Sequence, residues 1–156
     1  MAKTAEQWFA EYGESHQNPV NKRIHWLAVP TIFLTVVGFL WSIPTPALFD
    51  AWPLVNWATL AMVGVVLFYA RLSLSLAIGM TLFTLATLAI VAWFERMELA
   101  PVWLMSLILF VVMWVLQFYG HAVEGKKPSF FKDLQFLLIG PAWLMGFIYR
   151  RLGIPY

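Results

Sequence analysis

The sequence predicts an all-α fold, an integral membrane helical bundle that forms a single domain over residues 1–156. The chain is 62% hydrophobic and only 12% charged, whereas soluble domains carry roughly 45–50% apolar and about 25% charged residues. From Trp26 to Tyr119 the formal charges are confined to Asp50, Arg71, Glu95, Arg96 and Glu98. Apolar stretches of this length, separated by short polar turns, are typical of membrane spans and exclude a soluble globular protein.

Residues 1–23 are predicted to form a cytoplasmic segment with a short helix at the membrane interface. Thr4 is followed three residues later by Gln7, the capping-box pattern that starts a helix. Aromatic side chains then lie along one side of this helix, where they can rest on the membrane surface: Trp8, Phe9 and Tyr12. We expect Asn18-Pro19 to end the helix. Asn21 is a candidate N-cap for the next one, although Asn is also common in loops.

Four transmembrane helices are predicted between residues 24 and 119. The apolar stretch 24–41 is just long enough to cross a core of about 30 Å at roughly 1.5 Å per residue. The stretch 51–94 is interrupted only by Arg71 and accommodates two spans that are hinged there. A short charged loop then leads to a fourth span over residues 101–119.

The C-terminal part, residues 120–156, is predicted to be a cytoplasmic motif loop followed by a re-entrant or interfacial hairpin. Its apolar stretch 134–149 would reach only about 24 Å as a helix, and Gly140-Pro141 interrupts it. With four spans and a cytoplasmic N-terminus, nine of the ten basic residues face the cytoplasm and only Arg96 lies outside, in keeping with the positive-inside rule. A fifth crossing would move the last two arginines to the wrong side. We therefore expect both termini to be cytoplasmic, in a bacterial inner membrane.

Three histidines, His16, His25 and His121, are the candidate site residues. The chain has no cysteine, so a bound metal needs His, carboxylate, amide or water ligands, and a net charge of +2 gives no indication of nucleic-acid binding. His25 begins the first predicted span and His121 ends the fourth, so a bundle can bring them together at the cytoplasmic face. His16 joins them if the chain folds back at Asn18-Pro19. The alternative is that each is an interfacial histidine bonded to backbone or lipid.

A polar stripe surrounds the last histidine. Gln117, His121 and Glu124 share one face of a helix if that helix continues to Glu124. Imidazole and carboxylate ligands suit Fe(II), Mn or Zn, and the spacing does not choose among them. Alternatively, Gln117 pairs with another helix and Glu124 with a nearby lysine.

Two groups of residues resemble the motifs of a known family: Tyr12, His16-x-Asn18-Pro19-x-Asn21-Lys22-x-Ile24-His25 and Val29-Pro30, then Gln117-Phe118-x-Gly120-His121-x-x-Glu124-Gly125-Lys126-x-Pro128 and Gly140-Pro141. The chain is similar over essentially its whole length to a small membrane-protein family that includes the fungal 2-hydroxy-fatty-acid dioxygenase of phytosphingosine α-oxidation. Its bacterial members have long been catalogued as a domain of unknown function. The resemblance implies an Fe(II)-dependent dioxygenase that uses molecular oxygen to shorten a long-chain 2-hydroxy fatty acid by one carbon.

The resemblance, taken together with the pattern of polar residues, assigns roles to individual residues. His16, His25 and His121 match the family's histidines and are the expected iron ligands, with Glu124 as a fourth ligand or as a partner that orients an imidazole. The polar groups expected behind the ligands are Gln117, Asn18 and Asn21, and Lys22 is a candidate for binding the substrate carboxylate. An alkyl tail would lie among the apolar helices, where each buried CH₂ contributes roughly 0.8 kcal/mol. The competing functions are a b-type haem protein with two axial histidines and a non-catalytic lipid-binding scaffold.

Overall fold

A computed structural model describes residues 3–52, 54–125 and 136–156 of the chain. Within these ranges the regular structure is helical throughout, which confirms the all-α class. The elements are α1 (Ala5–Gly13), α2 (Pro19–Trp41), the 3₁₀-helix η1 (Ala47–Ala51), α3 (Trp57–Leu72), α4 (Leu74–Arg96), α5 (Val102–Glu124) and α7 (Ile139–Leu152).

Three of the helices, α2, α4 and α5, are long and apolar enough to cross a membrane. The helix α3 is apolar but has only 16 residues, about 24 Å against a hydrocarbon core of about 30 Å. The predicted pair of helices between residues 51 and 94 is present, but the break falls at Ser73 rather than at Arg71. The Ser73 side chain accepts a hydrogen bond from the backbone N–H of Leu76, and serine is a far better N-cap than arginine. The helices therefore establish three candidate spans, and the fourth remains a prediction.

Capping residues also place the ends of the other helices. The capping box of Thr4 and Gln7 is confirmed at the start of α1. The prediction for Asn21 is wrong, because Asn18 caps α2 by accepting from the N–H of Val20 at 2.8 Å, and Pro19 follows at N1, where a missing N–H is tolerated. The helix α5 continues five residues beyond the predicted end of the fourth span and stops at Gly125, which has a φ of 72° that favours glycine.

The C-terminal helix α7 covers most of the stretch predicted as a hairpin. Residues 134 and 135 lie outside the described part of the chain, and the remainder is a single helix from Ile139 to Leu152. Gly140-Pro141 does not interrupt it, because Pro141 lies in the first turn, where no helical N–H is lost. A re-entrant path is therefore not established for this segment.

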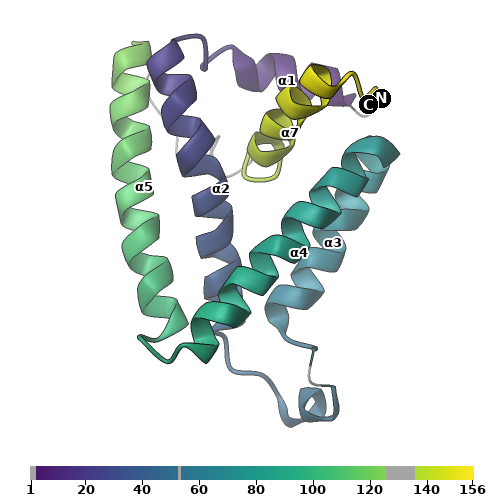
Figure 1. Cartoon of the computed structure of the whole chain (residues 1–156), viewed down its shortest axis with the longest axis vertical. Coiled ribbons are helices and arrows are strands. Elements are labelled where there is room, and N and C mark those ends of the chain that lie inside the picture. Colours follow the sequence, from purple (N-terminus) through teal and green to yellow (C-terminus); the bar gives the residue numbers. More distant parts are fainter. Residues whose placement is uncertain (1–2, 53, 126–135) are drawn as a thin grey trace.

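The helices form two pairs that meet at one end of the molecule and diverge at the other (Figure 1). The helix α2 packs along α5, and α3 packs along α4. The helices α1 and α7 lie in the opening between the diverging ends, in contact with each other. The N-terminal end of α2, the C-terminal end of α5 and both short helices are thus gathered at one end of the bundle, where the predicted site residues lie.

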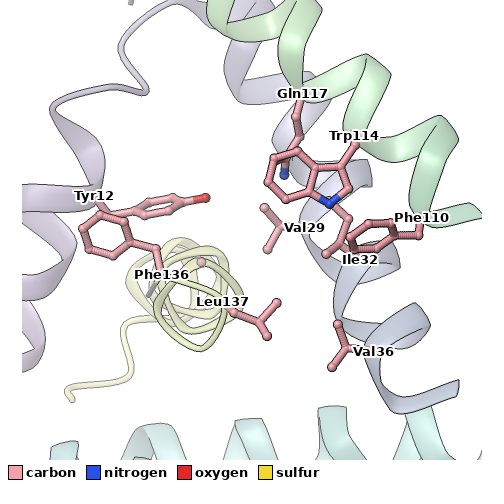
Figure 2. A pocket seen from close by; sticks show the side chains of 10 residues that line it. Tyr12, Val29, Ile32, Val36, Phe110, Trp114, Gln117, Phe136 and Leu137 are labelled. Atoms are coloured by element: carbon pink, nitrogen blue, oxygen red, sulfur yellow. The ribbon is translucent and has the colours of Figure 1, made fainter. Parts of the chain in front are cut away.

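Close approaches of two glycines hold α2 against α5. A Cβ atom at Gly38 would lie 2.1 Å from Ser106 Oγ, and one at Gly120 would lie 2.4 Å from Asn21 Oδ1. Small residues of this kind let membrane helices pack closely. Beside this contact, an apolar pocket lies between α2, α5, α1 and the residues that lead into α7 (Figure 2).

Candidate metal centre

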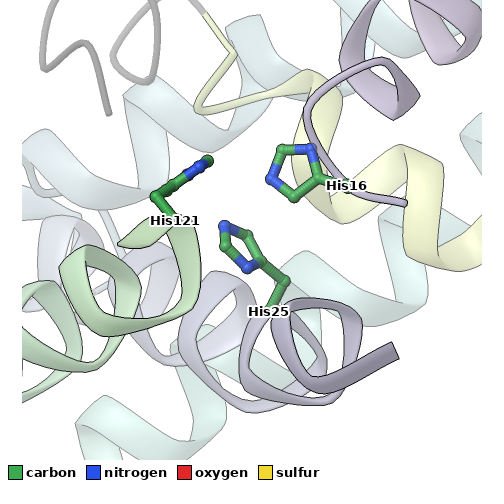
Figure 3. Close-up of side chains that lie close together, drawn as sticks. All are labelled: His16, His25 and His121. Atoms are coloured by element: carbon green, nitrogen blue, oxygen red, sulfur yellow. The ribbon is translucent and has the colours of Figure 1, made fainter. Parts of the chain in front are cut away.

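The three histidines point toward one another at the open end of the bundle (Figure 3). His16 comes from the turn after α1, His25 from α2 and His121 from α5. The ring centroid of His16 lies 4.2 Å from that of His25 and 5.2 Å from that of His121. The ring centroids of His25 and His121 are 5.1 Å apart. One ligand nitrogen from each residue lies within 4.8 Å of the others. The fold thus brings together three histidines from separate stretches of the sequence.

Backbone hydrogen bonds set which nitrogen of two of these rings faces the cluster. His16 Nδ1 lies 2.6 Å from the carbonyl oxygen of Tyr12, and His25 Nδ1 lies 2.9 Å from that of Asn21. A carbonyl oxygen only accepts, so each Nδ1 carries the proton and each Nε2 keeps its lone pair. This arrangement, in which Nδ1–H is bonded to a backbone carbonyl and Nε2 keeps its lone pair, is typical of metal-ligating histidines.

Several of the imidazole nitrogens are buried without a partner. His16, His25 and His121 are between 1% and 2% exposed. Within the described part of the chain, His16 Nε2 and both nitrogens of His121 make no hydrogen bond. Buried polar atoms are nearly always paired, so the cluster has the lone pairs and the unmet bonding capacity that a metal ion would satisfy.

Burial also keeps His16 in the form that binds metals. Removal from solvent lowers the pKa of His16 from 6.5 to about 4, and the carbonyl of Tyr12 opposes this shift only in part. The ring is therefore neutral at physiological pH, and a metal ion would not have to displace a proton from Nε2.

Aromatic side chains from α1 and α7 cover His16. The ring of Tyr12 stacks on it with centroids 4.2 Å apart and an angle of 14° between the planes. Trp143 of α7 lies 5.6 Å from the His16 ring and 5.2 Å from that of Tyr12. Tyr12 belongs to the family motif, but Trp143 was not predicted, because nothing in the sequence indicates that α7 packs over the turn after α1.

The carboxylate of Glu124 is directed to the segment that carries His16, and it is not a member of the three-histidine group. Glu124 Oε1 accepts from the N–H of Gln17 at 2.8 Å, and Oε2 accepts from the N–H of Asn18 at 2.8 Å and from Asn21 Nδ2 at 3.1 Å. Glu124 therefore connects the end of α5 to the start of α2 and to the turn between α1 and α2. These three bonds join residues that are more than a hundred positions apart.

The two predicted asparagines lie behind the histidines. Asn21 is fully buried, and its side-chain amide donates to the carbonyl of Ser15 at 3.1 Å as well as to Glu124. The backbone carbonyl of Asn21 accepts from His25 Nδ1. The side chain of Asn18 caps α2, and it is the backbone N–H of Asn18 that donates to Glu124.

Gln117 and Lys22 belong to the helices that carry His121 and His25, α5 and α2. Gln117 is buried one helical turn before His121 and lines the apolar pocket. Lys22 is half-buried, and its positive charge contributes to the lowered pKa of His16.

The sequence of the chain was compared with known proteins. A family model described as 2-hydroxy-palmitic acid dioxygenase Mpo1-like matches residues 2–152. Comparisons with curated proteins and with solved structures gave no match.

Proposed function

Because the chain belongs to the Mpo1-like family, we propose that it is an Fe(II)-dependent dioxygenase that shortens long-chain 2-hydroxy fatty acids by one carbon. We place the reaction at the cytoplasmic interface of the membrane. The observation that carries the proposal is the group of three buried imidazoles, with one ligand nitrogen from each within 4.8 Å of the others. Buried nitrogens without a hydrogen-bond partner, as in His16 and His121, cost free energy, and a bound ion would remove that cost.

The donor set fits the ion that the family implies. His16, His25 and His121 would hold it, and a set of three protein ligands leaves positions open for other groups. Imidazole also suits Zn, Cu and Ni, so the choice of iron rests on the family. Bound Fe(II) would supply the redox chemistry for oxygen activation and open positions for the carboxylate and hydroxyl of the substrate.

The proposed reaction is balanced with one molecule of oxygen for each fatty acid. The bond between carbons 1 and 2 breaks, carbon 2 becomes the new carboxyl carbon, and carbon 1 leaves as carbon dioxide together with one molecule of water. The two carbons lose the electrons that the oxygen molecule gains, so no separate reductant is required.

The residues of the chain would orient the ligands and the substrate. The carbonyls of Tyr12 and Asn21 hold His16 and His25 in one tautomer, and Glu124 fixes the segment that carries His16. Lys22 offers a half-buried cation for the substrate carboxylate. This assigns Glu124 to positioning rather than to metal binding.

The haem alternative receives less support from the geometry. A bis-histidine haem needs the macrocycle between two imidazoles, but the rings of His25 and His121 are 5.1 Å apart and both contact His16. A non-catalytic scaffold would leave the unpaired nitrogens of His16 and His121 without a reason.

The test is metal and product analysis of protein purified without chelator. We expect about one iron per chain, and mass spectrometry should find the fatty acid one carbon shorter from 2-hydroxy acids, but not from 3-hydroxy or unsubstituted acids. Alanine at His16, His25 or His121 should abolish iron binding and turnover while helical content is retained. Equal conversion of all three acid classes, or full iron content in any of these variants, would refute the proposal.

A further inference from the structure

We infer that the apolar pocket beside the three histidines receives the alkyl chain of the fatty acid, and that Val36 and Phe110 close its far end and limit the chain length. This inference rests on the proposed function for the identity of the ligand. The pocket itself is lined by residues of α1, α2 and α5, by the residues before α7 and by Gly140 in the first turn of α7.

The pocket adjoins all three histidines. Its lining includes Tyr12, Val29 and Gln117, which lie four residues before His16, four after His25 and four before His121. Residues four apart are neighbours on one face of a helix. Val29 and Gln117 are thus one helical turn from His25 and His121, and the Tyr12 ring stacks on His16, which lies in the turn after α1, with centroids 4.2 Å apart. The pocket therefore begins next to all three histidines, so that a ligand head group at the cluster leads directly into it.

The polarity of the lining changes along the pocket. Tyr12 and Gln117 supply polar groups at the end nearest the histidines, and Figure 2 shows Val36 at the opposite end from Gln117. The remaining lining is apolar or aromatic: Val29, Ile32, Val36, Phe110, Trp114, Phe136, Leu137 and Gly140. A fatty acid has the same distribution, with a polar head and an apolar chain.

The depth of the pocket is similar on both helices that form its walls. Val36 lies eleven residues after His25 on α2, and Phe110 lies eleven residues before His121 on α5. At 1.5 Å per residue both are about 16 Å from the histidines, roughly half the thickness of a bilayer core. The two side chains therefore lie at one level, where together they can bound an extended chain.

Chain-length profiles of two matched variants test the far end. Val36→Phe adds a ring inside the pocket, and Val111→Phe adds the same ring at a residue that is 52% exposed on α5. We expect Val36→Phe to lower kcat/KM about tenfold for long-chain 2-hydroxy acids, mainly through KM, with little change for short ones. Val111→Phe should leave both unchanged. Equal losses at all chain lengths, or equal effects of the two variants, would overturn the inference.

The opposite substitution keeps the test valid if Val36→Phe does not fold. Val36→Ala enlarges the far end, and we expect it to shift the preference toward longer chains. An unchanged chain-length profile for Val36→Ala would overturn the assignment of Val36.

Photo-crosslinking tests the pocket without turnover. A fatty acid that carries a diazirine at mid-chain should crosslink to Ile32, Phe110 or Trp114, as located by peptide mass spectrometry, and excess 2-hydroxy acid should compete. If crosslinks occur there in protein that shows no activity, the proposed reaction fails and the pocket inference stands. Crosslinks confined to exposed positions such as Val111 and Val115, or crosslinks that a fatty acid does not displace, would overturn the pocket inference whatever the activity.

Discussion

Replacing Glu124 with glutamine tests whether this carboxylate organises the metal centre from outside it. In the structure the two oxygens of Glu124 accept bonds from Gln17, Asn18 and Asn21, which surround the turn that carries His16. Glutamine keeps the size of the side chain but has a single acceptor oxygen, and its NH₂ group would face a backbone N–H. At least one hydrogen bond to a charged group is lost.

The expected loss of Fe(II) affinity in Glu124→Gln follows from the hydrogen bond that the substitution removes. Hydrogen bonds to charged groups contribute about 1.5–3 kcal/mol, and Glu124 is half-buried, so we take about 2 kcal/mol from the lower part of the range. If the ordering of the His16 turn is linked to metal binding, this weakens the affinity for Fe(II) about 30-fold. Loss of a group that orients metal ligands commonly weakens affinity by about 10- to 100-fold.

The assay is anaerobic competition for Fe(II) with a chromophoric chelator, on the parent and on Glu124→Gln. Glu6→Gln removes the same charge from an exposed residue in the first turn of α1, and we expect it to bind iron like the parent. Circular dichroism checks that the helices are retained. A dissociation constant for Glu124→Gln within about threefold of the parent would refute the positioning role.

Three further predictions concern packing, pH and topology. Gly120→Ala should reduce the stability of the protein by about 1–3 kcal/mol, measured by thermal unfolding in detergent, because the new Cβ would lie 2.4 Å from Asn21 Oδ1; Gly64→Ala, with nothing within 4 Å, should have little effect. Iron-free protein should lose up to about 3 kcal/mol of stability as the pH falls from about 6.5 to about 4. Burial lowers the pKa of His16, so the unfolded chain binds the proton at a higher pH than the folded protein does. His16→Phe should remove this part of the pH dependence, and a flat profile in the parent would contradict the burial argument. A cysteine at Thr45 should react with an impermeant reagent outside intact cells and one at Arg151 should not; the reverse pattern would invert the predicted orientation.

Local features of the sequence predicted where the helices lie and which residues are the candidate metal ligands. The capping box of Thr4 and Gln7, the apolar runs and the break near Arg71 depend on residues a few positions apart, so they can be read from the sequence. The placement of His25 and His121 at one level also follows from helix length alone. Even here a local choice was missed, because Asn18 and Asn21 are both good caps and only the structure shows that Asn18, with Pro19 after it, begins α2.

Contacts between distant residues were decided by the tertiary structure. The sequence places Glu124 on one face with His121, but its partners lie on the turn before α2 and at the start of that helix, and the close packing at Gly120 brings those segments together. The cover of Trp143 over His16 likewise depends on where α7 docks. Helix starts and spans are set by short-range hydrogen bonding and by transfer into lipid, which the sequence encodes locally. The partner of a buried polar group is set by which helices approach closely, and that depends on the packing of the whole bundle.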